Sequence, residues 1–121
     1  MTDTYGSTGR NRLSITRTST DGISVLTVGG EIDHTTVPQL QQALESGREA
    51  SAGRTVLDFQ AVTFMDSSGI NALVAAHRSA RASGGWVRLA GPTEPVLRVI
   101  QIVGLDAVIT CHPSLQQALC A

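Results

Sequence analysis

The chain contains no lysine, and all nine of its basic residues are arginine. A phosphate-binding loop of the Walker type and Schiff-base catalysis both need a lysine amine, so both are excluded. Basic and acidic residues nearly balance, nine against ten, which leaves a net charge of -1. Without a basic excess to neutralise phosphates, nucleic acid is not expected to be a partner.

Long hydrophobic runs are also missing. The apolar stretches are interrupted before they reach about 18 residues, so no membrane span is expected. Residues 1–11 lack the apolar core and basic flank of a secretory signal, and their Thr, Ser, Gly and Asp content predicts a flexible tail. Residues 12–121 suit a single domain with a modest core, which we expect to lie in the cytoplasm.

Cysteine and histidine are sparse. Cys111 and Cys120 lie nine residues apart near the end of the chain, a weak basis for a disulfide, and we interpret them as a strand thiol and a tail thiol. The three histidines fall in three separate segments without ligand spacing. Neither a metal site nor a bound cofactor is therefore predicted.

Hydrophobic periodicity predicts an α/β fold with about five strands and four helices in the order β-β-α-β-α-β-α-β-α. Strands are expected over 13–18, 23–28, 55–59, 86–90 and 108–111. Helices are expected from Val37 toward Ala50, with Thr35 or Thr36 as N-cap, then over 68–83 and 92–103, and after Pro113. The Asp21-Gly22 turn makes the first two strands a hairpin, and the helical crossovers make the later strands parallel. The predicted sheet is therefore mixed and mostly parallel.

The most informative segment is Asp66-Ser67-Ser68-Gly69, which directly follows an apolar strand and opens an amphipathic helix. Two hydroxyls and a carboxylate thus lie on the first turn of a helix, where backbone N–H groups are unpaired and the dipole is positive. Such a site can hold a phosphate. Helix capping by Asp66 and its neighbours, worth about 1 kcal/mol, is the simpler interpretation, and the two are compatible.

Several segments in this order and spacing resemble the STAS domain of bacterial anti-sigma factor antagonists. They are Gly30-Glu-Ile-Asp-His-Thr-Thr36, Val56-Leu-Asp58, Phe64-Met-Asp-Ser-Ser-Gly69, Gly84-Gly85 and Val103-Gly-Leu-Asp106. The resemblance covers about residues 13–120, nearly the whole chain, and it implies a small single-domain STAS-type fold.

The resemblance also implies a function without catalysis by this chain. In the family, the unphosphorylated protein binds an anti-sigma factor that is also an ATP-dependent serine kinase, and this binding frees the sigma factor. The kinase, which holds the ATP, then phosphorylates the antagonist and releases it, and a PP2C-type phosphatase resets the cycle. The acceptor serine of the family corresponds to Ser67, and we expect a monomer or weak dimer.

Five further residues are expected to support this site: Asp33, Asp66, Ser68, Gly69 and Asn71. Asp33 either positions the hydroxyl or a magnesium ion brought by the kinase, or it caps the first helix. Gly69 either lets the kinase backbone approach closely or packs against the sheet. Asn71 stands where the family commonly has glycine, so it is expected to affect the choice of partner.

Two other function classes fit this sequence less well. The same fold serves as a scaffold in stress-signalling assemblies and as an appendage of anion transporters, but this sequence has no membrane segment or second sensory domain. A serine hydrolase is disfavoured because Met65 and Gly69 flank Ser67, so the Gly-x-Ser-x-Gly motif is missing. No catalytic residue is therefore predicted.

Overall fold

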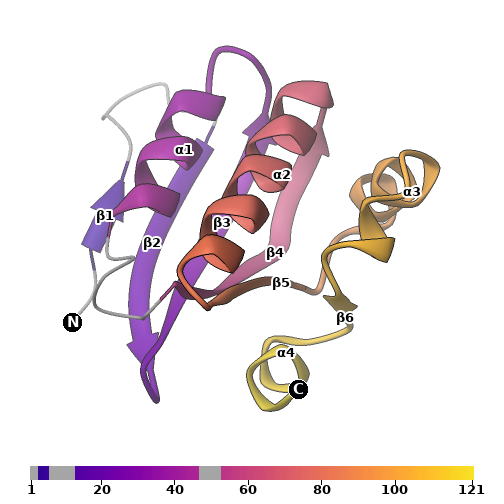
Figure 1. Cartoon of the computed structure of the whole chain (residues 1–121). Helices are drawn as coiled ribbons and strands as arrows, with labels where there is room; N and C mark the ends of the chain where they lie inside the picture. Colours follow the sequence, from indigo (N-terminus) through magenta and orange to yellow (C-terminus); the bar gives the residue numbers. More distant parts are fainter. Residues whose placement is uncertain (1–2, 6–12, 47–52) are drawn as a thin grey trace.

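The computed structural model describes residues 3–5, 13–46 and 53–121, and it has an α/β fold (Figure 1). The strands are β1 (Asp3–Tyr5), β2 (Leu13–Thr20), β3 (Ile23–Ile32), β4 (Arg54–Met65), β5 (Trp86–Ala90) and β6 (Cys111–His112). The helices are α1 (Val37–Glu45), α2 (Ser67–Ala82), α3 (Glu94–Ile102) and α4 (Leu115–Cys120), with a short 3-10 helix η1 (Leu105–Ala107). None of these helices is long and apolar enough to cross a bilayer.

The six strands form one mixed sheet in which spatial order equals chain order, β1-β2-β3-β4-β5-β6. β1 and β3 both pair with β2 in antiparallel fashion, whereas β3, β4, β5 and β6 are parallel to one another. The predicted Asp21-Gly22 hairpin turn is confirmed, and both residues have the positive φ, 51° and 77°, that this tight turn requires. The mixed, mostly parallel sheet is confirmed as well.

Helices cover both faces of the sheet, and each face has its own apolar cluster. The main core joins α1, α2 and α3 to one face through fully buried side chains, among them Leu13, Leu26, Leu40, Leu57, Phe59, Leu73 and Ile100. α1 and α2 lie next to each other across this face (Figure 1). On the other face, Ala118 of α4 packs against Ile23, Val56 and Ala90. α4 thus covers only the part of that face near the amino end of β4.

The ends of several elements differ from the sequence prediction. β4 continues to Met65 instead of ending at residue 59, and the last strand is Cys111–His112 instead of 108–111. α1 ends at Glu45, and the continuation expected toward Ala50 lies outside the described residues. Within the span predicted to be a tail, Asp3–Tyr5 pairs with β2 as strand β1.

The second half of β4 was not predicted because the pairing of β4 with β3 is irregular at two places. The register shifts between Thr27 and Gly29, and again between Gly30 and Glu31. Each shift adds a residue to β4 and changes which face the following side chains point to. Val62 and Met65 are both buried in the main core although they are three positions apart, a spacing that simple alternation does not predict.

Candidate functional site

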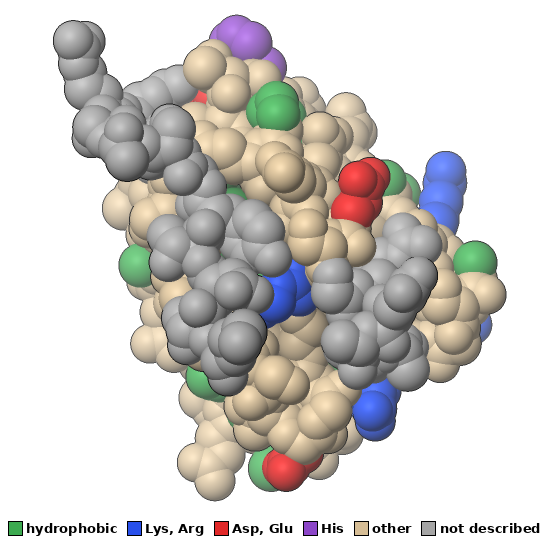
Figure 2. All heavy atoms as spheres, turned by 90° about the vertical axis from the view of Figure 1, so that its left-hand side faces the viewer, with side chains coloured by type: hydrophobic (Ala, Val, Ile, Leu, Met, Phe, Trp, Pro, Cys, Tyr) green, Lys and Arg blue, Asp and Glu red, His purple; other side chains and the backbone are tan. Residues whose placement is uncertain are grey.

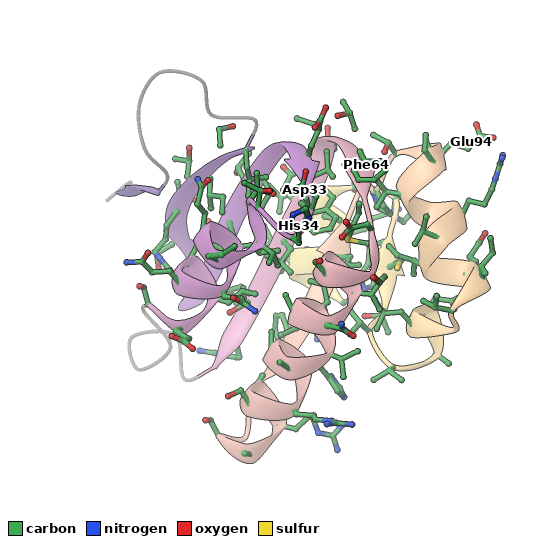
Figure 3. The ribbon with its side chains drawn as sticks, turned by 90° about the horizontal axis from the view of Figure 1, so that it is seen from above. Asp33, His34, Phe64 and Glu94 are labelled. Carbon is green, nitrogen blue, oxygen red and sulfur yellow. The ribbon has the colours of Figure 1, made fainter. Side chains whose placement is uncertain are left out.

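β3 and β4 end side by side, and the helices that follow them start at the same edge of the sheet. Ile32 and Met65 are register partners at the two strand ends. The backbone N–H of Asp66 donates to the carbonyl oxygen of Ile32 at 3.1 Å, which extends this pairing by one residue. The edge therefore brings together the β3–α1 loop and the N-terminus of α2, and Figure 3 looks down on it.

Asp66 is the N-cap of α2. Its backbone is extended (φ -106°, ψ -168°), and its Oδ1 accepts a hydrogen bond from the N–H of Ser68 at 2.8 Å. Its carbonyl oxygen accepts from the N–H of Gly69 at 3.1 Å and so begins the helical pattern. The capping interpretation of Asp66 is confirmed.

The two serines of the motif have different surroundings. Ser67 is the first residue of α2, one position earlier than predicted, and it is exposed, whereas Ser68 is half-buried. Within the part of the chain that the structure describes, no group hydrogen-bonds the hydroxyl of Ser67. Its oxygen is thus open to solvent at a helix N-terminus, where an anion is favoured.

Gly69 has a packing role that the structure makes explicit. A Cβ atom added there would lie 2.5 Å from Cγ of Met65, 2.8 Å from Sδ of Met65 and 2.9 Å from Cγ2 of Ile32. Glycine therefore lets the first turn of α2 sit directly on the ends of β3 and β4. The intramolecular explanation for Gly69 accounts for its presence without any contact to a kinase.

Asn71 lies one helical turn after Ser67 and is exposed. Residues four positions apart share a face of a helix, so Asn71 borders Ser67 on the outer surface of α2. A protein that docks on Ser67 would meet the Asn71 side chain as well.

Asp33 organises the β3–α1 loop. Its Oδ1 accepts hydrogen bonds from the N–H groups of Thr35 at 2.9 Å and Thr36 at 3.1 Å. Thr35 or Thr36 was predicted as the N-cap of α1. Thr36 is the residue at this position, but its side chain makes no cap hydrogen bond. Asp33 thus caps the turn that leads into α1, close to the predicted helix-capping role, while its role toward the Ser67 hydroxyl or a magnesium ion stays a prediction.

The hydroxyl of Thr36 fixes the loop from inside. Thr36 is only 4% exposed, and its Oγ1 donates to the carbonyl oxygen of Glu31 at 2.8 Å and accepts from the N–H of Asp33 at 2.9 Å. His34 and Thr35 are left exposed at the tip of the loop. The edge next to Ser67 is therefore a rigid loop with a polar tip.

Phe64 was not predicted to belong to the site. An apolar residue in a strand is assigned to the core by default, yet 49% of Phe64 is exposed at the end of β4, beside the site. The signal that could have found it is Met65, because two consecutive apolar residues of a strand cannot both face one core.

The remaining candidate groups lie away from this edge. Cys111 and Cys120 are free thiols, half-buried in β6 and exposed at the end of α4 respectively, and burial together with the charge of Asp106 raises the pKa of Cys111. Among the residues with described positions, no three His, Cys, Asp or Glu side chains are grouped so that they could hold a metal ion.

The chain matches a known family. The family model of the STAS domain matches residues 14–118. The chain belongs to the STAS domain family. This confirms the resemblance on which the assignment of Ser67 was based.

Relatives and solved structures agree with the assignment. The anti-sigma-B factor antagonist of Listeria monocytogenes is 32% identical over 80% of this chain and 84% of its own. The crystal structure of an anti-sigma factor antagonist from Mycobacterium paratuberculosis is 30% identical, covers 94% of this chain and 97% of its own, and has a TM-score of 0.83. The Bacillus cell fate determinant SpoIIAA in its phosphorylated form, 23% identical over 87% of this chain and 96% of its own, shares the fold with a TM-score of 0.67.

Proposed function

We propose that this STAS domain is an anti-sigma factor antagonist whose binding is switched off by phosphorylation of Ser67. The observation that carries the proposal is the exposed Ser67 hydroxyl at the start of α2, and the names of its relatives support it. In this proposal the unphosphorylated protein acts in the cytoplasm and binds an anti-sigma factor that is also a serine kinase. That binding frees the sigma factor.

The covalent step belongs to the partner. The kinase transfers the γ-phosphoryl group of its bound ATP to Oγ of Ser67, the serine proton leaves to a base on the kinase, and ADP is the second product. A PP2C-type phosphatase hydrolyses the ester and restores the serine. This STAS domain supplies only the acceptor oxygen and the surface around it, so we propose that it has no catalytic activity of its own.

The fold itself should tolerate the phosphate. A phosphoserine adds roughly -1.5 to -2 charges at neutral pH. At the first position of α2 these charges lie where backbone N–H groups and the helix dipole favour an anion. Phosphorylation is therefore expected to act on the interface and to leave the folded structure in place.

The interface should respond strongly because a partner that fits the neutral Ser67 would meet a bulky group with about two negative charges, and any carboxylate of the partner close to Ser67 would be repelled. Asp66 adjoins Ser67, and Asp33 follows the partner strand end. Two like charges about 4 Å apart repel by about 4 kcal/mol at an effective dielectric constant of about 20. A third of that energy weakens binding about tenfold. A partner whose surface fits the unmodified edge would therefore bind the phosphorylated protein much more weakly.

A kinase assay with the matched pair Ser67→Ala and Ser68→Ala tests the acceptor. Each protein is incubated with the candidate anti-sigma kinase and ATP, and the phosphate is mapped by mass spectrometry. Ser67→Ala should lose the phosphate, while Ser68→Ala should keep it. Phosphate on Ser68 of the wild-type protein would contradict the assignment.

Binding measurements test the switch. Titration calorimetry with the same kinase should give similar affinity for the wild-type protein and Ser67→Ala, and at least tenfold weaker binding for Ser67→Asp. Equal affinity of all three would end the proposal. Size-exclusion chromatography should show a monomer or weak dimer, whereas a large homo-assembly would favour the scaffold function instead.

A further inference from the structure

Phe64 is turned away from the core at the end of β4. It is 49% exposed, whereas its neighbours Val62 and Met65 are 0% and 3% exposed. Its register partner is Glu31, and the next pair, Ile32 and Met65, points into the main core. Because side chains alternate along a strand, Phe64 and Glu31 share the opposite face.

The arrangement of β4 explains why about half of this residue remains exposed. The register shift between Gly30 and Glu31 is a β-bulge, and such a bulge re-aims the side chains that follow it. α4, the helix on that face, packs on Val56 and Ala90 toward the other end of the strands. The phenyl ring therefore stands on the surface a few residues from Ser67.

A single exposed apolar side chain is common on protein surfaces, so the surroundings of Phe64 decide its meaning. Four acidic residues lie toward the same end of the fold: its register partner Glu31, Asp33 and Asp66 directly after the two strand ends, and Glu94 at the start of α3. Glu94 opens α3, which is held beside β4 by a hydrogen bond from Oγ1 of Thr93 to the carbonyl oxygen of Val62 at 2.7 Å. Asp33, Phe64 and Glu94 are labelled in Figure 3 on the end of the molecule that faces the viewer. We call these five residues the Phe64 surface.

The carboxylates of the Phe64 surface are partly balanced within the molecule, and Glu31 and Asp33 each take part in a further interaction. Glu94 is paired with Arg98 at 3.0 Å, so part of its charge is balanced on the spot. Toward the opposite end of the fold, described arginines occur together with the carboxylates of Asp21 and Glu45; these arginines are Arg54, Arg17, Arg78 and Arg81. The view onto the β1 side shows acidic and basic side chains scattered, with hydrophobic ones in small separate groups (Figure 2).

We propose that Phe64 is the apolar anchor by which this STAS domain docks on its anti-sigma factor. The occupant of the Phe64 surface is a patch of that partner with an apolar recess for the phenyl ring and arginine or lysine side chains around it. Charge complementarity with the four carboxylates selects such a patch, and a buried aromatic ring supplies affinity at the centre of an interface. The inference rests on the proposed function and deepens it.

The same arrangement connects docking with release. Ser67 lies three residues beyond Phe64, so a phosphate on it would add a bulky group to the same surface. Its size and the cost of removing its water shell would oppose the close contact that burial of the phenyl ring needs. The anchor and the acceptor therefore work on one interface.

Alanine substitution tests the anchor. The wild-type protein and the variants Phe64→Ala, Phe64→Thr, Val103→Ala and Val108→Ala are titrated with the anti-sigma kinase, and dissociation rates are measured. Val103 and Val108 are matched controls because they are 54% and 51% exposed but lie at the far end of α3 and beyond η1. Truncation of Phe64 should weaken binding about 10- to 100-fold, mainly through faster dissociation, as for aromatic hot spots. Both controls should stay within about twofold of wild type, a difference of about 0.4 kcal/mol.

Folding of the variants is checked by thermal unfolding. Phe64→Thr keeps a β-branched residue in the strand, so it remains informative if Phe64→Ala unfolds. Glu31→Gln should slow association and reduce its dependence on salt, whereas Phe64→Thr should leave that dependence unchanged.

The outcomes separate the two proposals. If the wild-type protein binds and Ser67→Asp does not, but the Phe64 variants bind within twofold of wild type, the anchor is wrong and the switch stands. Equal losses in Val108→Ala would also overturn the anchor. If the wild-type protein is a dimer, and the Phe64 variants are monomers whose affinity for the kinase is unchanged, the occupant is a second copy and the inference fails. If the unmodified protein does not bind any anti-sigma kinase, both proposals fall.

Discussion

Asp33 and Asp66 occupy equivalent positions on two neighbouring parallel strands. Each is the first residue after the paired strand ends Ile32 and Met65, and each carboxylate accepts a backbone N–H two residues further on, from Thr35 and Ser68. Asp66 is the N-cap of α2, whereas Asp33 caps the turn before α1, so both chain segments leave the same edge of the sheet through a carboxylate that accepts backbone N–H groups. Two carboxylates, one after each strand end, are therefore held in place at the edge that also carries the exposed Ser67.

The capping bonds of Asp33 can be tested by truncation. Asp33→Ala removes the acceptor for the N–H groups of Thr35 and Thr36, so the free energy of unfolding should fall by about 1 kcal/mol. Asp33→Asn keeps an oxygen acceptor and should lose less, which makes it the matched control. Urea denaturation gives both values, and equal stability of Asp33→Ala and wild type would show that the loop does not depend on this carboxylate.

The close contact at Gly69 predicts a larger loss. In Gly69→Ala the new methyl group would overlap Met65 and Ile32, so the start of α2 has to shift away from the sheet. Overpacking of this kind costs about 1–3 kcal/mol and should lower the melting temperature by several degrees. Ser68→Ala is the control on the adjacent residue. A melting temperature of Gly69→Ala equal to that of wild type would contradict the packing role.

Thr36 should be less tolerant of change than an ordinary helix-cap threonine. Thr36→Val keeps the shape but leaves the N–H of Asp33 and the carbonyl oxygen of Glu31 without their buried partner. We expect a loss of about 1–3 kcal/mol in unfolding free energy. Thr36→Ser keeps the hydroxyl and should recover most of it. Similar losses in the two variants would mean that the methyl group, and not the hydroxyl, stabilises the loop.

A negative charge at residue 67 should leave the fold intact. In Ser67→Asp the carboxylate gains about 0.3–1 kcal/mol from the α2 N-terminus, offset in part by repulsion from Asp66, so the net change should stay below about 1 kcal/mol. Circular dichroism and thermal unfolding measure it. Loss of cooperative unfolding in Ser67→Asp would mean that phosphorylation acts by unfolding and not at the interface.

The two thiols should react at different rates with iodoacetamide at about pH 8. Burial, and then the charge of Asp106, raises the pKa of Cys111, whereas Cys120 is exposed. The thiolate is the reactive form, so Cys120 should be alkylated first, as followed by mass spectrometry. Asp106→Asn should speed the labelling of Cys111. Faster labelling of Cys111 than of Cys120 would contradict the assignment.

The same shift predicts how stability depends on pH. Because the pKa of Cys111 is raised in the folded protein, the contribution of this thiol is fully present below the unfolded pKa, about 8.5. It is lost as the pH rises above that value through the folded pKa. Cys111→Ser should remove this part of the alkaline decline in unfolding free energy.

Most of the fold could be predicted from the sequence because the pattern and the turn residues agree. The alternation over β2, the Asp21-Gly22 turn and the capping residues before α2 each indicate one local structure, and the structure confirms them. The second half of β4 could not be predicted, because its two bulges break the alternation that identifies a strand. The exposure of Phe64 was missed for the same reason. Which of the two serines reaches the surface follows from where α2 begins, a boundary that sequence patterns place only within a few residues.

The order of the strands bears on how the chain reaches its native state. Every strand pairs with the one that precedes it in the sequence, so each new segment can join an edge that already exists. On the ribosome, where the N-terminal part emerges first, assembly can proceed stepwise without waiting for a distant piece of polypeptide. The β2–β3 hairpin can close locally, whereas each parallel pairing has to wait until the helical connection between its two strands has been made.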